Sequence, residues 1–455
     1  MRRSLGRATV QVPLKLYIAA AVMFSAAALL MICRPAVAAT LEVGPDYYTI
    51  SSALADARDG DIIEVRSGTY REKLVIDKRV HLIGLESPVI TAPGGNMVRI
   101  SSPDVVFEGF TLRYDNGEPE SSDAAIIIDK AAVGARVRNN RLVGVMFGVW
   151  NIEGEDIWIE NNIISGIEAL DKSHRGNCIN LTGSQRVHII DNTLSDCRDG
   201  IYMELCHDAT VTGNDISRSR YSVHTMWVDR GTFTGNTVYD NLVGLAIMYT
   251  KHSSIKDNRS YGNQTHGLLA IQNVRSELVG NEIIGNTKGI FLYNSVYNNL
   301  AANLVMNNQV GIHSWGGSEE NSVEGNSFIN NEIQIKYVAS RDQVWNGNYW
   351  SDYIGWDMTG DGVGDYTYES NSIVDHIFWR YPVAKVLYTS PSLQLLWMLE
   401  KQFPVFDIPK VADNRPAMTP WHGNWKELNE KYSSYVPGRI YGEIEKLHHV
   451  PGSGR

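Results

Sequence analysis

Residues 192–213 read NTLSDCRDGIYMELCHDATVTG, residues 214–235 read NDISRSRYSVHTMWVDRGTFTG and residues 236–257 read NTVYDNLVGLAIMYTKHSSIKD. Each stretch is 22 residues long, begins with asparagine and has an apolar residue two positions later. Self-similarity at a fixed period of about 20 to 50 residues is typical of repeat proteins. The sequence therefore predicts a repeat architecture in the middle of the chain.

The asparagine marker extends well beyond these three stretches. It recurs at gaps of 22 or 23 residues, apart from one gap of 30 that we explain by an insertion near residues 169–176. In stacked repeats the marker residues lie one above another, so we expect their side-chain amides to form a hydrogen-bonded ladder. The marker positions are Asn140, Asn162, Asn192, Asn214, Asn236, Asn258, Asn281, Asn303, Asn326 and Asn348.

A second marker, a glycine followed by an apolar residue, runs in phase with the first. Alternating apolar residues follow each glycine, which indicates short β-strands with one buried face. We predict an all-β fold, a right-handed parallel β-helix of about a dozen coils over residues 39–345. A leucine-rich repeat has a similar period but needs a dense leucine consensus, which is missing. The second marker stands at Gly200, Gly244, Gly267, Gly289 and Gly311, with Ser222 in the remaining slot.

The first 38 residues have the layout of a secretory signal peptide. A basic start precedes an apolar run from Leu16 to Ile32, and Ala36-Val37-Ala38 follows as a cleavage site. An uncleaved membrane anchor is the alternative interpretation. Cleavage removes five basic and no acidic residues, which moves the formal net charge from −10 to about −15. The sequence therefore predicts a periplasmic protein and argues against general nucleic-acid binding.

Export also bears on the cysteines and on how the solenoid ends. Cys178, Cys197 and Cys206 remain in an oxidising compartment, where they allow at most one internal disulfide, of open pairing, and leave one thiol. A solenoid end exposes apolar surface and an open strand edge, so it needs a cap. We expect a short capping helix near Ile50–Ala57.

The strand after each glycine marker directs two side chains outward. This outward set is unusually apolar and aromatic for a solvated sheet, which suggests a surface that meets a partner. Cover by a long loop or by the C-terminal tail is the alternative. The outward pairs are Tyr202/Glu204, His224/Met226, Ala246/Met248, Leu269/Ile271, Phe291/Tyr293 and His313/Trp315.

Two methionines of this set are predicted to stack on adjacent coils. Thioether and imidazole groups suit Cu(I), which is a soft cation. Scattered surface and turn residues with no shared ligand are the alternative. The copper candidates are His224, Met226, Met248, Cys206 and His207.

An enzyme is the alternative function. Exported β-helices often cleave or epimerise acidic polysaccharides, which needs a base and a group that neutralises the sugar carboxylate. A polysaccharide lyase or C-5 epimerase acting on uronates is therefore kept as the alternative, although the Asp-Pro-His-Asp signature of alginate epimerases is absent. The residues that would serve it are Glu204, His224, Asp229, Lys251 and His252.

A segment of different composition, residues 346–420, follows the repeats and is predicted to cap the solenoid or to dock on a partner. Its Asp357, Asp361 and Asp365 are spaced by four with glycines between them, a pattern that suits Ca²⁺. A polar capping loop with no metal is the alternative. Residues 421–455 are predicted to form a polar tail.

The same segment contains a predicted helix that begins at Ser390-Pro391 and ends before Pro404. It is too short to span a bilayer and too apolar for a solvated helix. We expect it either to cap the solenoid or to dock into a membrane protein. Its docking candidates are Leu393, Leu396, Trp397, Leu399 and Phe403.

Several motifs of this C-terminal part resemble one family, the periplasmic nitrous-oxide reductase maturation proteins called NosD. The resemblance covers essentially the whole chain after the signal peptide. Its motifs are residues 347–353 (GNYWSDY), the Gly360-Asp361-Gly362 loop, 381–385 (YPVAK), 390–396 (SPSLQLL), 402–405 (QFPV), 413–416 (DNRP) and 418–420 (MTP).

The resemblance implies a non-enzymatic periplasmic accessory protein that binds copper. Family members help to assemble the copper–sulfur cluster of nitrous-oxide reductase. They work with an ABC-type transporter made of an ATPase and a membrane subunit, so the chain would be membrane-associated through this partner, and a separate copper chaperone can dock on them. No phosphate-binding Gly-rich Lys-Ser/Thr loop is present here, so ATP hydrolysis would belong to the transporter.

Overall fold

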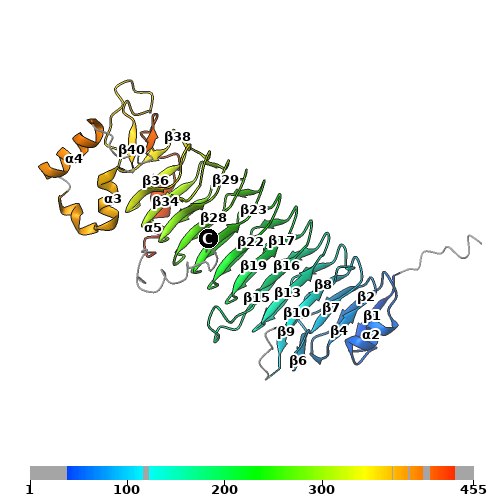
Figure 1. The fold of residues 1–455 in the computed structure, drawn as a ribbon. Coiled ribbons are helices and arrows are strands. Elements are labelled where there is room, and N and C mark those ends of the chain that lie inside the picture. Colours follow the sequence, from blue (N-terminus) through cyan, green and yellow to red (C-terminus); the bar gives the residue numbers. More distant parts are fainter. Residues whose placement is uncertain (1–37, 116–121, 371, 388–389, 403–409, 436–455) are drawn as a thin grey trace, which may run out of the picture. The chain divides into compact units, whose positions relative to one another are not determined.

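The computed structural model describes residues 38–115, 122–370, 372–387, 390–402 and 410–435. The chain divides into two units at residues 39 and 40, and the predicted signal peptide lies almost wholly outside the described residues. Within the second unit the strands stack coil upon coil from Thr40 to Trp350 into a parallel β-solenoid, as Figure 1 shows. The predicted parallel β-helix architecture is confirmed.

Each coil contributes one strand to each of three parallel sheets, which have 14, 13 and 12 strands among the described residues. Sheet A consists of β1 (Thr40–Val43), β2 (Ile62–Val65), β5 (His81–Gly84), β8 (Val106–Glu108), β11 (Arg136–Arg138), β14 (Trp158–Glu160), β17 (His188–Ile190), β20 (Thr210–Thr212), β23 (Thr232–Thr234), β26 (Ser254–Lys256), β29 (Glu277–Val279), β32 (Asn299–Ala301), β35 (Ser322–Glu324) and β38 (Val344–Asn346). Sheet B consists of β3 (Thr69–Arg71), β6 (Val89–Ala92), β9 (Thr111–Tyr114), β12 (Arg141–Val143), β15 (Ile163–Ser165), β18 (Thr193–Ser195), β21 (Asp215–Ser217), β24 (Thr237–Tyr239), β27 (Arg259–Tyr261), β30 (Glu282–Ile284), β33 (Leu304–Met306), β36 (Ser327–Ile329) and β39 (Tyr349–Trp350).

Sheet C carries the longest strands, most of them six residues long in its second half. The strand after each glycine marker belongs to it, as the sequence predicted. Sheet C consists of β4 (Leu74–Ile76), β7 (Val98–Ile100), β10 (Ala124–Ile128), β13 (Phe147–Ile152), β16 (Ile179–Thr182), β19 (Asp199–Glu204), β22 (Tyr221–Met226), β25 (Val243–Met248), β28 (His266–Ile271), β31 (Lys288–Tyr293), β34 (Val310–Trp315) and β37 (Ile333–Val338).

The asparagine ladder forms as expected, in the interior of the solenoid. The Asn214 amide nitrogen donates to the Ile189 carbonyl oxygen (2.9 Å) and to Oδ1 of Asn236 (2.9 Å). Its own Oδ1 accepts from the backbone N–H and the side-chain amide of Asn192, both at 3.0 Å. The pattern repeats along the stack at Asn192, Asn214, Asn236, Asn258, Asn281, Asn303 and Asn326, all at most 1% exposed.

A second ladder, which the sequence analysis missed, lies at another corner of the coils. Each member stands five residues after a member of the first ladder, so the same period contained the signal. Asn241 accepts from the Ser219 backbone at one end (2.9 Å), and each amide then bonds to the next. The members are Asn241, Asn263, Asn286, Asn308 and Asn331.

The two ends of the stack are covered in different ways. Helix α2 (Ile50–Asp56) confirms the predicted N-terminal cap, with Thr49 as its N-cap residue. At the other end, β40 (Tyr368–Ser370) pairs with β41 (Val411–Asp413), and the Trp350 ring stacks on Tyr368 with ring centroids 4.4 Å apart. The fully buried Asp413 accepts from both nitrogens of Asn348, so a carboxylate takes the place of the next asparagine.

The remaining helices follow the solenoid. They are α3 (Ile373–Arg380), the 3-10 helix η1 (Pro382–Leu387), α4 (Pro391–Gln402) and α5 (Trp425–Lys431). The predicted helix after Ser390 is thus confirmed as α4. No helix in the described part of the chain has both the length and the apolarity to cross a bilayer.

The polar tail predicted for residues 421–455 is wrong for residues 421–435. Leu428 and Tyr432 are buried in a cluster on sheet B with Ile284, Leu304 and Met306. Two rings, Tyr261 and Tyr432, contact each other with centroids 4.5 Å apart. Apolar residues at helical spacing bury against a sheet that is distant in sequence, which composition did not show. Residues 436–455 lie outside the described residues.

We predict that Asn214→Ala lowers the free energy of unfolding by about 2–4 kcal/mol, because it leaves buried backbone groups on two coils without partners. Urea denaturation followed by circular dichroism measures the loss. The matched control is Asn299→Ala, since Asn299 is exposed on β32 of the same stack and should change stability by less than about 0.5 kcal/mol. Equal losses in the two variants would contradict a stabilising role for the ladder.

Candidate functional site

The outer face of sheet C carries the chemistry-bearing residues in three columns fixed by strand register. Each strand from β19 to β37 directs its first, fourth and sixth residues to this face. The first column is Asp199, Tyr221, Val243, His266, Lys288, Val310 and Ile333; the middle column is Tyr202, His224, Ala246, Leu269, Phe291, His313 and Lys336; the last is Glu204, Met226, Met248, Ile271, Tyr293, Trp315 and Val338.

The centre of this face is less exposed than the sequence suggested. Val243, Ala246, Leu269 and Phe291 form a cluster separate from the main core and are at most 8% exposed. Strands in a sheet lie about 4.8 Å apart, so side chains at one register position cover one another. Larger exposed apolar surface remains at Trp315, which is 46% exposed.

A histidine held by a buried carboxylate lies near the middle of sheet C, on β22 beside β19. Asp199 is fully buried, and its Oδ2 lies 3.0 Å from Nδ1 of His224. Arg220 donates to the same carboxylate from Nε (3.0 Å) and Nη2 (2.8 Å). Nε2 of His224 is buried and has no hydrogen-bond partner among the described residues. With Nδ1–H donating to Asp199, the lone pair of Nε2 is available to a ligand.

The charged groups beside His224 are the Asp199 carboxylate and the Arg220 guanidinium, which bond to each other. Burial alone would raise the pKa of Asp199, but the hydrogen bond with His224 and the Arg220 charge outweigh it and lower the pKa. Burial raises the pKa of Tyr202 to about 12 and also raises that of Tyr221. Both phenol rings meet His224 edge-on, with centroids 5.1 and 4.8 Å away, so neutral aromatic walls flank the imidazole.

The methionine pair lies beside this histidine. Met226 and Met248 are register partners on β22 and β25, and both side chains are half-buried. Met226 is two residues after His224 and points to the same face, while Glu204 is its register partner on β19. The structure therefore brings together three of the five copper candidates. One imidazole and two thioethers suit Cu(I) better than a hard cation.

The other two copper candidates do not join them. Cys206 is fully buried in the core, where burial raises the pKa of its thiol to about 11, while His207 is exposed at the turn. The physical reason is the left-handed backbone of Leu205 (φ 53°), which turns Leu205 outward and Cys206 inward. Cys206 therefore does not share the outer face with His224, Met226 and Met248.

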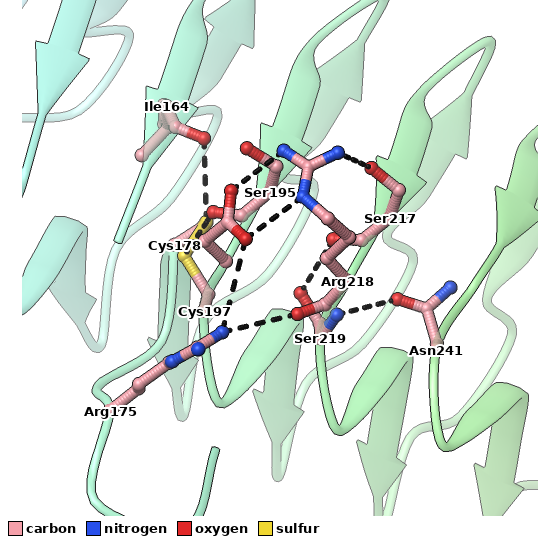
Figure 2. Close-up of a disulfide and its surroundings, with 10 residues drawn as sticks. Ile164, Arg175, Cys178, Ser195, Cys197, Ser217, Arg218, Ser219 and Asn241 are labelled. Atoms are coloured by element: carbon pink, nitrogen blue, oxygen red, sulfur yellow. Dashed lines mark hydrogen bonds and ion pairs between the residues drawn. A yellow bond between two sulfur atoms is a disulfide. The ribbon is translucent and has the colours of Figure 1, made fainter. Parts of the chain in front are cut away.

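A disulfide and the predicted insertion both contact the backbone that leads into β19 and Asp199. Cys178 and Cys197 form the disulfide, with both side chains fully buried and Cα atoms 5.6 Å apart, as Figure 2 shows. Cys206 remains a free thiol, so the expectation of one disulfide and one leftover cysteine is confirmed. Because Cys197 is two residues before Asp199, the disulfide fixes the backbone that enters β19.

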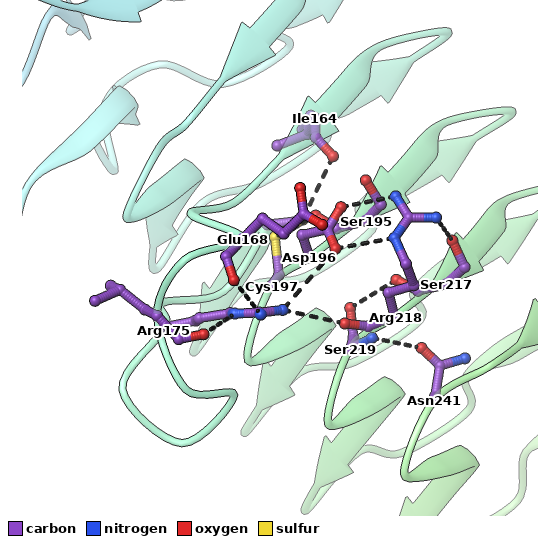
Figure 3. A network of polar contacts seen from close by, with 12 residues as sticks. Ile164, Glu168, Arg175, Ser195, Asp196, Cys197, Ser217, Arg218, Ser219 and Asn241 are labelled. Carbon is purple, nitrogen blue, oxygen red and sulfur yellow. Dashed lines mark hydrogen bonds and ion pairs between the residues drawn. A yellow bond between two sulfur atoms is a disulfide. The ribbon is translucent and has the colours of Figure 1, made fainter. Parts of the chain in front are cut away.

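The insertion lies between β15 and β16 and is held by Arg175. Its guanidinium donates to the carbonyl oxygens of Leu170 and Glu168 (both 2.8 Å). It also donates to the carbonyl oxygen of Arg218 (3.2 Å) and lies 4.0 Å from Asp196 (Figure 3). Arg218 in turn bonds to both Asp196 oxygens. The strand entry at residues 196–199 is thus fixed by ion pairs and the disulfide together.

The aspartates of the Gly-rich loop do not form the predicted calcium site. Asp357 accepts from the backbone N–H groups of Gly360 (2.6 Å) and Gly362 (2.8 Å), and Asp365 accepts from that of Met358 (2.6 Å). The hydrogen bond with Gly362 lowers the pKa of Asp357. The described residues hold no cluster of three or more His, Cys, Asp or Glu side chains placed for a metal ion. The carboxylates instead fix the loop by bonding to its own backbone.

The docking candidates on α4 are only partly accessible. Leu399 is 41% exposed, while Leu393 and Leu396 are half-buried. The side chain of Trp397 and the whole of Phe403 lie outside the described residues. Their neighbours Leu395 and Met398 are about half exposed, which leaves α4 an apolar surface.

Comparison with known proteins gives the family. A family model described as "Periplasmic copper-binding protein (NosD)" matches residues 160–355. A protein of Pseudomonas aeruginosa named "Probable ABC transporter binding protein NosD" is 36% identical over 371 residues, which cover 77% of this chain and 87% of that one. A Stutzerimonas stutzeri protein of the same name is 35% identical, covering 77% and 85%. The chain belongs to the NosD family.

Membership of the NosD family confirms the resemblance drawn from the sequence motifs. Among solved structures, that of DFA-IIIase from Arthrobacter chlorophenolicus A6 without its lid is similar, with a TM-score of 0.50 and 18% identity. The match covers 67% of this chain and 96% of that one. At this identity the likeness shows the β-solenoid fold alone.

Sequence reasoning missed Asp199 and Arg220, although the repeat contained a signal for both. Asp199 comes directly before the Gly200 marker, at a position where the following coils have tyrosine or valine. Arg220 comes directly before the next coil's strand. An aspartate before one strand and an arginine before the next are placed to pair across neighbouring coils, and here Asp199, bonded to Arg220, orients His224 of this NosD family member.

We predict that Asp199→Asn destabilises the protein by roughly 3–5 kcal/mol at neutral pH, because it leaves the half-buried Arg220 without its counter-charge. The native pKa of Asp199 is lowered below the unfolded value of about 3.9, so its contribution is present above that pH and is lost as the pH falls through the native pKa. Urea titrations from pH 7 to pH 3 should therefore show a flatter acid limb for the variant than for the wild type.

The matched control is Asp208→Asn, which removes the carboxylate of an exposed ion pair with Arg230 (2.7 Å). Exposed pairs contribute about 0–1 kcal/mol because solvent screens them. An unchanged acid limb in Asp199→Asn would show that Asp199 is not the charged partner described here.

Proposed function

We propose that this protein is a non-enzymatic periplasmic accessory protein that binds Cu(I) transiently and takes part in assembling the copper–sulfur centre of nitrous-oxide reductase. The single observation that supports it best is the set of His224, Met226 and Met248 on the outer face of sheet C, in a family described as periplasmic copper-binding. Calcium plays no part in the proposal.

The chemistry of the three side chains fits transient binding. Nε2 of His224 supplies one nitrogen ligand in an orientation fixed by Asp199. The thioethers supply two soft, neutral sulfur ligands that favour Cu(I) over harder cations and bind it reversibly. Because Met226 and Met248 are only half-buried on the outer face of the sheet, a metal bound there would remain within reach of another protein.

The proposed partners follow from the family. Two relatives are named ABC transporter binding proteins, so we propose an ABC transporter as partner, with ATP hydrolysis in its ATPase subunit. Contact with the membrane subunit would use α4, whose surface includes the exposed Leu399. A copper chaperone would load the sheet C site, and nitrous-oxide reductase would receive the product.

The residues of the alternative function, a lyase or epimerase acting on uronates, are less well placed for a common site than the three copper candidates. Asp229 bonds to His252 (2.9 Å) and Arg230 (2.6 Å) at the exposed turns, whereas His224 belongs to the face of sheet C. The candidate base and the candidate neutralising groups thus stand on different surfaces of the coil. We therefore propose assembly rather than sugar chemistry.

Replacing the two thioethers tests the copper site. We predict that Met226→Leu with Met248→Leu weakens Cu(I) binding by tenfold or more, about 1.4 kcal/mol, while stability stays close to wild type because the side-chain volumes are similar. Competition with a coloured Cu(I) chelator measures the affinity. The control is Met358→Leu, which alters a methionine that is 81% exposed on the Gly-rich loop. An affinity equal to wild type in the double variant would remove these methionines as ligands.

Deletion and co-purification test the assembly role. Loss of the protein should leave nitrous-oxide reductase in the periplasm without its copper–sulfur centre, as its absorption spectrum would show. The tagged chain should co-purify with the transporter subunits. Turnover of a polyuronate by the isolated chain, together with a normal reductase in the deletion strain, would favour the alternative.

A further inference from the structure

The C-terminal end of the sheet C outer face is basic, in contrast to the part around Asp199. Lys288 begins β31, His313 lies on β34 and Lys336 lies on β37. His313 is the register partner of both Phe291 and Lys336, so it stands between them in the middle column. Four strand spacings of about 4.8 Å separate His313 from His224, or about 19 Å. This cluster is therefore separate from the proposed copper site.

His313 has an unsatisfied polar atom in this cluster. The residue is only 7% exposed, and its Nδ1 is buried with no hydrogen-bond partner among the described residues. The ring lies against Phe291 and Trp315, with centroids 4.9 and 6.2 Å away. Burial, followed by the charges of Lys288 and Lys336, lowers the pKa of His313 to about 3, so the ring is neutral at physiological pH. A buried polar atom left without a partner costs free energy, which a ligand can recover.

The two lysines add positive charge to this face, and Lys288 forms no ion pair with a carboxylate among the described residues. The ammonium of Lys288 lies 4.7 Å from the centroid of the Phe291 ring. Burial, followed by the charge of Lys336, lowers the pKa of Lys288 to about 8. Burial also lowers the pKa of Lys336.

We propose that Lys288, His313 and Lys336 form a binding site for a small oxyanion. The two ammonium groups would supply charge-assisted hydrogen bonds to its oxygens. His313 in the tautomer protonated at Nδ1 would donate a third hydrogen bond, which gives the buried nitrogen its missing partner. Phe291 and Trp315, whose rings lie against His313, would form apolar walls of the site.

The chemical class follows from the charges. Lys288 and Lys336 lie two strands apart on a half-buried face, with His313 on the strand between them, and an anion at this place would be attracted to both ammonium groups. A neutral imidazole can contribute a hydrogen bond but no further charge, so an anion of one or two negative charges suits the site. A metal cation does not suit it, because the two ammonium groups would repel the ion.

The test measures whether an anion protects Lys288. The folded mature chain is labelled at pH 8 with an amine-reactive reagent, in chloride buffer of constant ionic strength, while sulfate, phosphate or acetate replaces part of the chloride. Mass spectrometry reports each lysine separately. We expect at least one of the three anions to slow labelling of Lys288 saturably, while the exposed Lys130, already paired with Glu153 (2.8 Å), keeps its rate.

Variants connect this protection to the other two residues. Lys336→Met and His313→Phe should each raise the half-protecting anion concentration about tenfold, the loss of about 1.4 kcal/mol. Lys336→Arg retains the charge and should retain the protection, so it checks that any loss is not a folding defect. The proposal is overturned if none of the three anions protects Lys288 beyond chloride, or if protection is equally strong in Lys336→Met and His313→Phe.

Discussion

The whole arrangement depends on the buried amide ladder. Each asparagine of the ladder accepts from the backbone and side chain of the preceding coil and donates to a carbonyl oxygen of that coil and to the next asparagine. These bonds satisfy polar groups at a corner that water does not reach, so a coil can only stack in one register. Where the repeats end, Asp413 supplies the acceptor that the next asparagine would have given. The C-terminal segment is thus joined to the solenoid by the same interaction that builds it.

Fixed register turns a linear repeat into a surface with defined columns. His224 reaches Asp199 because their strands are neighbours, and Met226 meets Met248 for the same reason. From β22 to β37 the outer face changes in chemistry. It begins with His224 bonded to Asp199, continues through a packed apolar cluster and ends with Lys288 and Lys336. A rigid sheet keeps these parts at constant separation, which suits the role that we propose.

The predictions failed at residues whose side-chain orientation and contacts are not set by the repeat pattern. Cys206 follows the strand β19 and was a copper candidate together with His224, but after the left-handed Leu205 its side chain lies in the core. The three aspartates of the Gly-rich loop have metal-like spacing, yet their oxygens bond to nearby backbone N–H groups. Residues 421–435 look polar in composition, but Leu428 and Tyr432 bury against sheet B through contacts distant in sequence.

The sequence by itself determined the solenoid, the asparagine ladder, the N-terminal capping helix and the methionine stack, because all of these are periodic or local and a 22-residue period can be read from one chain. The family was also within its reach, since the C-terminal motifs are specific. Only the tertiary structure decided that Cys178 pairs with Cys197, that Asp199 and Arg220 orient His224, and that Lys288, His313 and Lys336 share one face. These relations join different coils through turns whose backbone angles and long-range packing the repeat pattern does not specify.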